Sequence, residues 1–461
     1  MDLLASIFLD LRLPNAATWF YCTLLLAVAL FVKFSRLLSM RNWDVLTLFL
    51  LVPGLLLRQE ALQDNPTTES SSSETVAAAT PASSASAQRL LWFAYLWLLC
   101  GSAYWFGRCL FDLALERRPA LSPNMNFSGM AWLAGALFIG MVALAVRHAA
   151  ERPEQLGHGS VALDQAQKQA VALVEAEAGV PAHPHVRQGV SYGLAILCHL
   201  AIAAMLLYIG CRHFQDSTGG MAAATFYLLL PYTTYHFEQV HLAWPAALLL
   251  GAVACYRRPA VAGLLLGLAT GSVFFPVLLA PLWLSFYARR GAGRFLAGFL
   301  LATVFTLAIG CLFLWWEGEL ARGLRQMLNW SDWQPWKEPT TEGFWTEVSW
   351  AYRIPVFIVY LAFVVMTAFW PKPKNLGQVI ALSAALLIGI QFWYADKGGV
   401  YILWYLPLLL LLVFRPNLSD RYPPSVLVSL TWVRRLGQAM WRGMYRLLRL
   451  PEPMSNAVGE R

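Results

Sequence analysis

The stretch Phe295–Trp316, FLAGFLLATVFTLAIGCLFLWW, decides the fold class, because it contains no charged side chain from end to end. A helix needs roughly 20 apolar residues to cross the hydrocarbon core of a bilayer. The basic residues Arg289, Arg290 and Arg294 precede the stretch, and the long polar segment Glu317–Arg353 follows it. The sequence therefore predicts a transmembrane helix here, with a basic turn at its start.

Further apolar segments of similar character bring the predicted number of transmembrane helices to about thirteen by the same length rule. The other candidates are Ala17–Leu38, Trp43–Leu57, Leu90–Leu110, Gly129–Val146, Val190–Cys211, Gly219–Tyr235, Leu242–Tyr256, Ala260–Gly271, Phe274–Tyr287, Ile354–Trp370, Leu376–Tyr394 and Val400–Phe414. Ala260–Gly271 is short and rich in glycine, so it and Phe274–Tyr287 form either two spans or one re-entrant pair. The whole chain is 58% hydrophobic and 13% charged, against about 25% charged in soluble proteins. Much of its surface must therefore face lipid.

Basic residues between the segments predict the orientation, since Lys and Arg are enriched in cytoplasmic links. With Lys33, Arg36 and Arg41 in the cytoplasm, basic and polar links alternate along the chain without conflict. We expect an all-helical, multi-pass protein of the inner cell membrane. Its N-terminus lies outside and its C-terminus in the cytoplasm.

The chain then divides into a transmembrane helical domain, 1–416, and a basic amphipathic cytoplasmic tail, 417–461. The predicted external loops are a disordered Ser/Thr/Ala tract at 68–88, a loop with a short helix at 148–188, and a Trp-rich loop at 317–353. Arginines alternate with apolar residues in the tail, which predicts a helix lying on the anionic inner leaflet.

Three polar constellations on the predicted external face are candidate sites, because ionisable groups near membrane depth are costly and usually functional. The first is the link His236–His241, where Glu238 and His241 are three residues apart and share a helix face. A carboxylate beside an imidazole can act as a general base, or can bind a divalent metal together with His236. Metal is the less favoured role, since the HxExxH spacing differs from HExxH. A polar turn at a wet interface is the alternative.

The second constellation is the Trp-rich loop, where Trp330, Trp333 and Trp336 recur every third residue around Asp332. Indole faces can stack on sugars, and a carboxylate can hold sugar hydroxyls. An aromatic belt at the headgroup level is the alternative. Because belts anchor the ends of spans and this cluster lies in mid-loop, we favour sugar binding.

The third constellation is Asp396-Lys397-Gly398-Gly399, between the last two spans. Lys397 suits a phosphate and Asp396 suits a hydroxyl. Ordinary turn chemistry also explains these four residues, and this interpretation is favoured.

Several function classes lose support from the sequence. Without a P-loop, a Rossmann fingerprint or a GxSxG motif, ATP-driven transport and hydrolase chemistry are disfavoured. Span interiors are nearly free of charge, which disfavours ion-coupled transport. Basic residues occur in short runs between spans, so nucleic acid is not an expected partner. The seven cysteines form no CxxC pair, and neither a metal nor another cofactor is expected.

One stretch has a more specific pattern. It contains Leu230-Pro231, the polar turn 236–241, an apolar span, Arg257-Arg258, the run AGLLLGLA from Ala262 and Phe275-Pro276. From Leu228 to Gly298 this pattern resembles the multi-span GT-C glycosyltransferases, which use polyprenyl-phosphate sugars. The resemblance implies a divergent member with Glu238 at the position of a substrate-site carboxylate. Such enzymes also place an acidic residue in the first external loop, where this chain offers Glu60 and Asp64.

We therefore expect inverting transfer of a sugar from a polyprenyl-phosphate donor to a lipid or glycan acceptor on the external face. In this scheme Glu238 is the base, His241 orients it, and Lys397 or Arg353 stabilises the departing phosphate. The alternative is a non-catalytic multi-span protein for lipid or envelope handling or assembly. Membrane lipids are partners in either case.

Overall fold

The computed structural model describes residues 16–63, 81–115, 122–151, 184–237, 239–288, 290–316, 334–338, 343–416, 418 and 421–423. Every regular element in these ranges is helical, and none of their residues forms a strand. The expected all-helical fold is therefore confirmed.

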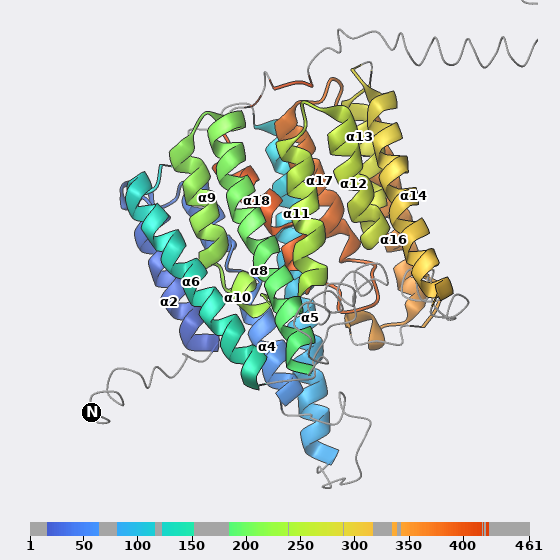
Figure 1. Ribbon diagram of the computed structural model, residues 1–461. Coiled ribbons are helices and arrows are strands. Elements are labelled where there is room, and N and C mark those ends of the chain that lie inside the picture. The colour runs from blue at the N-terminus through green and yellow to red at the C-terminus, as the bar shows by residue number, and fades with distance from the viewer. Residues whose placement is uncertain are drawn as a thin grey trace, which may run out of the picture. The chain divides into compact units, whose positions relative to one another are not determined.

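In the described part of the chain, the helices lie side by side and form a bundle (Figure 1). In order they are α2 (Ala16–Phe31), α3 (Met40–Thr47), α4 (Val52–Gln63), α5 (Pro81–Phe111), α6 (Phe127–Glu151), α8 (Pro184–Ile209), α9 (Ser217–Leu229), α10 (Pro231–Tyr235), α11 (Val240–Ala254), α12 (Pro259–Ser272), α13 (Ala280–Phe286), α14 (Ala292–Trp316), α16 (Arg353–Phe369), α17 (Leu376–Ile390) and α18 (Leu406–Phe414). A π-helical turn, η4 (Gly210–Phe214), extends α8.

Six helical segments are long and apolar enough to cross a bilayer, so the chain is a membrane protein. They are Met40–Leu62, Ser86–Ala114, Phe127–Leu144, Ser191–Phe214, Ala292–Leu312 and Trp350–Phe369. The other predicted spans coincide with shorter apolar helices, such as α11 and α17. The total of about thirteen spans and the orientation of the termini stay predictions.

The outer helices expose stripes of large apolar side chains. On α14, Leu301, Val304 and Phe305 are 68%, 61% and 60% exposed. On α16, Ile358 and Val359 are 58% and 69% exposed. Exposed apolar surface costs about 25 cal/mol per Å² against water but nothing comparable against lipid. These stripes are therefore the lipid-facing surface of the bundle.

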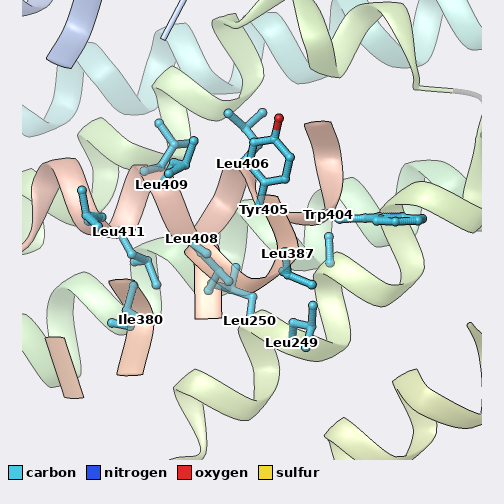
Figure 2. Close-up of a cluster of buried hydrophobic side chains, with 14 of the residues drawn as sticks. Leu249, Leu250, Ile380, Leu387, Trp404, Tyr405, Leu406, Leu408, Leu409 and Leu411 are labelled. Carbon is cyan, nitrogen blue, oxygen red and sulfur yellow. The ribbon is translucent and has the colours of Figure 1, made fainter. Parts of the chain in front are cut away.

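The inner helices are shielded from lipid by other helices. All nine residues of α18 are buried, and α18 packs against α17 and α9. Figure 2 shows Leu408, Leu409 and Leu411 of α18 beside Leu250 of α11 and Ile380 of α17. A helix of this length rises only about 14 Å. Such a short helix is stable inside the bundle because protein, rather than lipid, surrounds it.

Small residues allow α12 and α14 to pack closely. A Cβ atom on Gly263 would lie 2.1 Å from the Phe295 carbonyl oxygen, and one on Gly298 would lie 2.3 Å from the Ala260 carbonyl oxygen. Gly267 lies one turn after Gly263 and is just as crowded. Glycines spaced by four residues are a common way for membrane helices to approach backbone to backbone. The short, glycine-rich segment thus forms a helix of its own, held along α14.

The links that the sequence assigns to the cytoplasm meet at one end of the bundle. This arginine-rich end comprises the described residues of 32–39, 112–126, 210–216, 255–258, 287–291, 370–375 and 415–423. The Asn124 side-chain amide donates a hydrogen bond to the Val32 carbonyl oxygen at 3.0 Å. Arg290 Nη1 donates to the Pro423 carbonyl oxygen at 3.0 Å. These contacts join links that are far apart in the sequence.

A buried network of four charges lies at the same end. Arg108 donates two hydrogen bonds of 2.7 Å to the Asp44 carboxylate and a third of 3.2 Å to Asp112. Arg415 donates to Asp112 from Nε at 3.1 Å and also from Nη2. Burial lowers the pKa of Arg415 to about 10, with Arg108 contributing, so Arg415 is charged at neutral pH. The network fastens the end of α18 to α3 and α5.

Candidate functional site at the loop end

The opposite end of the bundle, here called the loop end, contains the described residues of 230–241, 272–275, 334–353 and 391–405. Segment 391–405, which joins α17 to α18, is in contact with the Trp-rich loop. Trp345 Nε1 donates a hydrogen bond to the Phe392 carbonyl oxygen at 3.1 Å, and Arg353 Nε donates to the Trp393 carbonyl oxygen at 3.2 Å. The described end of the Trp-rich loop, 343–353, therefore lies beside the third constellation.

The first constellation reaches the same segment. The 3-10 turn η8 (Ile402–Trp404) packs against α10 and α11, the helices on either side of the link His236–His241. The Trp404 ring stacks on Phe275 with centroids 3.8 Å apart and on Tyr401 at 4.3 Å. The described parts of the link 236–241, of the Trp-rich loop and of segment 391–405 thus meet at the loop end. Segment 391–405, the one that sequence reasoning favoured least as a site, lies between the other two.

His236 is the most unusual group at this end. It is only 2% exposed, and its Nδ1 lies 3.2 Å from Gln239 Oε1. Because that oxygen only accepts, Nδ1 carries the proton and Nε2 has a free lone pair, with no partner among the described residues. Burial, with the charge of Arg58 next, lowers the pKa of His236 to about 3. The neutral imidazole is a weak base, but Nε2 can accept a hydrogen bond from a hydroxyl group.

Polar pairs that the sequence analysis missed surround this imidazole. His199 Nδ1 lies 2.8 Å from the Tyr227 hydroxyl inside the bundle. Arg58 Nε donates to the Tyr95 hydroxyl at 3.0 Å, and Arg58 is close enough for its charge to act on His236. A signal existed in the sequence: His199 interrupts an apolar span, and Arg58 directly follows one.

The Asp-Lys-Gly-Gly link combines a turn with a polar contact. The Tyr401 hydroxyl donates to the Asp396 carboxylate at 2.6 Å. Lys397 has a φ of 46° and Gly399 a φ of 96°, the left-handed region that such turns use. Their geometry fits a turn, and contacts of Asp396 or Lys397 with a substrate stay predictions.

Arg353 has a structural role in this arrangement. Its side chain is fully buried and also donates from Nη1 to the Lys337 carbonyl oxygen at 3.0 Å. Together with the bond to Trp393, this contact ties residues 334–338 to segment 391–405 across the start of α16. The contact predicted between Arg353 and a phosphate stays a prediction.

The remaining candidates divide between described and undescribed residues. Glu238, Trp330, Asp332 and Trp333 lie outside the described residues. Trp336 is 57% exposed, and His241 is half-buried in the first turn of α11. Within the described ranges, no three His, Cys, Asp or Glu side chains are grouped closely enough to hold a metal ion.

Comparison of the chain with protein-family models, curated proteins and solved structures gave no match. The function of the protein therefore has to be inferred from the geometry of the loop end.

Proposed function

We propose that this protein is a membrane glycosyltransferase that moves a sugar from a polyprenyl-phosphate donor to a lipid or glycan acceptor. Transfer takes place at the loop end, which the sequence predicts to be external. One observation carries the proposal: described parts of three polar segments from distant parts of the sequence meet at this end, which also holds the buried His236 imidazole with a lone pair that has no partner among the described residues.

A site for this reaction needs groups for both the sugar and the phosphate. The His236 Nε2 lone pair and the Asp396 carboxylate are acceptors for sugar or acceptor hydroxyls. The cations at this end include the Lys397 ammonium. The low pKa of His236 makes it a binding group rather than a base, which leaves the base role with the carboxylate of Glu238.

The proposed reaction is a single displacement with inversion. Glu238 removes the proton from the acceptor hydroxyl as its oxygen forms a bond to the anomeric carbon. The bond between that carbon and the phosphate oxygen breaks, and the electron pair leaves with the lipid phosphate. A nearby cation stabilises the added negative charge.

A second candidate function is non-catalytic handling or assembly of lipids or envelope components. The role of Arg353 favours it, because this guanidinium is bound to two backbone carbonyl groups. A guanidinium that holds two loops in place is less available to stabilise a departing phosphate.

Glu238→Gln tests the catalytic proposal, because it keeps the size of the side chain and removes the base. Loss of a general base typically lowers the rate by about 10² to 10⁴. We expect this loss in transfer from a polyprenyl-phosphate sugar by the protein in reconstituted membranes, with little change in thermal stability.

Glu347→Gln is the matched control, because Glu347 is an exposed carboxylate at the same end. It should transfer sugar at the wild-type rate. Equal activity of Glu238→Gln and the control would remove Glu238 from the mechanism. A wild-type protein that transfers no sugar from polyprenyl-phosphate donors would favour the handling function.

A further inference from the structure

The arginine-rich end carries a second, separate charge feature. Six arginines there make no ion pair within the described residues: Arg36, Arg212, Arg257, Arg258, Arg290 and Arg421. The described carboxylates at this end are already engaged, since Asp44 and Asp112 belong to the buried network. Asp216 caps α9 by accepting from the Gly219 backbone N–H at 2.8 Å. The cluster therefore has a strong net positive charge that the described chain does not compensate.

Three of these arginines lie near one buried imidazole. Arg257, Arg421 and Arg212 are all close enough for their charges to act on His213. His213 Nε2 lies 2.7 Å from the Ala254 carbonyl oxygen, so Nε2 carries the proton. Its Nδ1 is buried with no partner among the described residues. Buried polar atoms are rarely left without a partner, and one that is requires an explanation.

Exposed apolar side chains lie about one to two helical turns from Arg212 and Arg258, toward the middle of the bundle. Tyr208, four residues before Arg212, is 50% exposed and its ring contacts His213. Val261 and Leu264 of α12, which follow Arg258, are 37% and 38% exposed. Cations at the helix ends with exposed apolar side chains next to them match a phospholipid, whose phosphate lies just outside its acyl chains.

We propose that the ends of η4 and α11, with residues 421–423, form a binding site for the headgroup of an anionic phospholipid. Arg212, Arg257 and Arg421 bind the phosphate by charge-assisted hydrogen bonds. A headgroup hydroxyl, as in phosphatidylglycerol, donates to His213 Nδ1. The acyl chains lie along Tyr208, Val261 and Leu264. This site is at the opposite end from the proposed transferase site and does not depend on it.

The test measures phosphatidylglycerol binding to the full-length protein in neutral detergent by native mass spectrometry, with phosphatidylcholine for comparison. The double variant Arg212→Gln/Arg257→Gln removes two exposed cations from the site. Each basic residue contributes about fivefold to binding of an anionic lipid surface, so the double variant should bind phosphatidylglycerol about 25-fold more weakly. Phosphatidylcholine binding should not change.

The matched control is Arg89→Gln/Lys337→Gln, which removes one exposed cation from the loop end and one from α5, where the adjacent Gln88 donates to Glu347 of the loop end. The proposal requires this control to bind phosphatidylglycerol as the wild type does. Equal weakening by both double variants would show diffuse attraction and overturn the site. Displacement of the lipid by inorganic phosphate at similar concentration would identify a soluble anion instead, and would overturn the lipid assignment.

Discussion

The substitution Asp112→Asn should be among the most destabilising single changes in the described chain. Asp112 is almost fully buried and accepts hydrogen bonds from both Arg108 and Arg415. Arg108 keeps its two bonds to Asp44 in the variant, but Arg415 has no other carboxylate in the buried network. One uncompensated guanidinium would then stay buried.

The expected cost follows from that loss. Removing one partner from a buried ion pair typically lowers the free energy of unfolding by about 3–5 kcal/mol. Arg415→Gln should cost less, because Asp112 keeps the contact of 3.2 Å with Arg108. Asp112→Asn/Arg415→Gln removes both charges, so its cost should fall short of the sum of the two single costs by about 1–3 kcal/mol.

Unfolding by denaturant in mixed micelles, followed by tryptophan fluorescence, measures these values at neutral pH. Repeating the measurement in high salt should change the result little, since buried charges are poorly screened. A cost below about 1 kcal/mol for Asp112→Asn, typical of ordinary surface positions, would refute the stabilising role of the network. Additivity of the two single effects would refute the coupling between Asp112 and Arg415.

Two further predictions concern single buried positions. Since His236 has a pKa of about 3 in the folded protein and about 6.5 when unfolded, the unfolded state binds more protons between these values. Stability should fall by about 1.4 kcal/mol per pH unit below pH 6.5, and in melting curves His236→Asn should lose less than the wild type between pH 6.5 and 5. Gly377→Ala places a Cβ atom 2.6 Å from Arg415 Nη1 and should cost about 1–3 kcal/mol. Gly107→Ala, where no atom lies within 4 Å, should be neutral or stabilising, and equal melting temperatures for these two alanine variants would contradict the crowding at Gly377.

The fold class could be predicted because apolar length is a local property. Phe295–Trp316 is written in the sequence as an uninterrupted apolar run, and α14 has nearly the same bounds. Segment 260–271 is ambiguous in the sequence because the length rule assumes a helix alone in lipid. In the structure α12 is not alone in lipid, because Gly263 and Gly267 allow it to pack closely against α14. This stabilisation depends on both segments, so neither segment alone indicates it.

The polar contacts were much harder to predict. In the sequence, Arg108 and Arg415 look like ordinary basic residues that mark the cytoplasmic ends of spans. In the structure both are buried and form ion pairs. Asp112 and Arg415 are 303 residues apart in the sequence, and no local pattern indicates that they meet. Arg353 donates to the backbone carbonyl groups of Trp393 and Lys337, contacts that no local pattern indicates, and its predicted contact with a phosphate stays a prediction. Residue type suggested which side chains matter, but the packing of distant helices determines their partners.

The placement of α17 and α18 also constrains how the molecule is made. These helices come last from the ribosome among the described helices, yet they occupy the interior, where α17 packs on α5 and α18 packs on α9. Helices synthesised earlier cannot reach their final packing until the last two have entered between them. A nascent chain that stops before Leu376 would leave α5 and α9 facing an unfilled centre. Completion of the bundle therefore waits for the synthesis of α17 and α18.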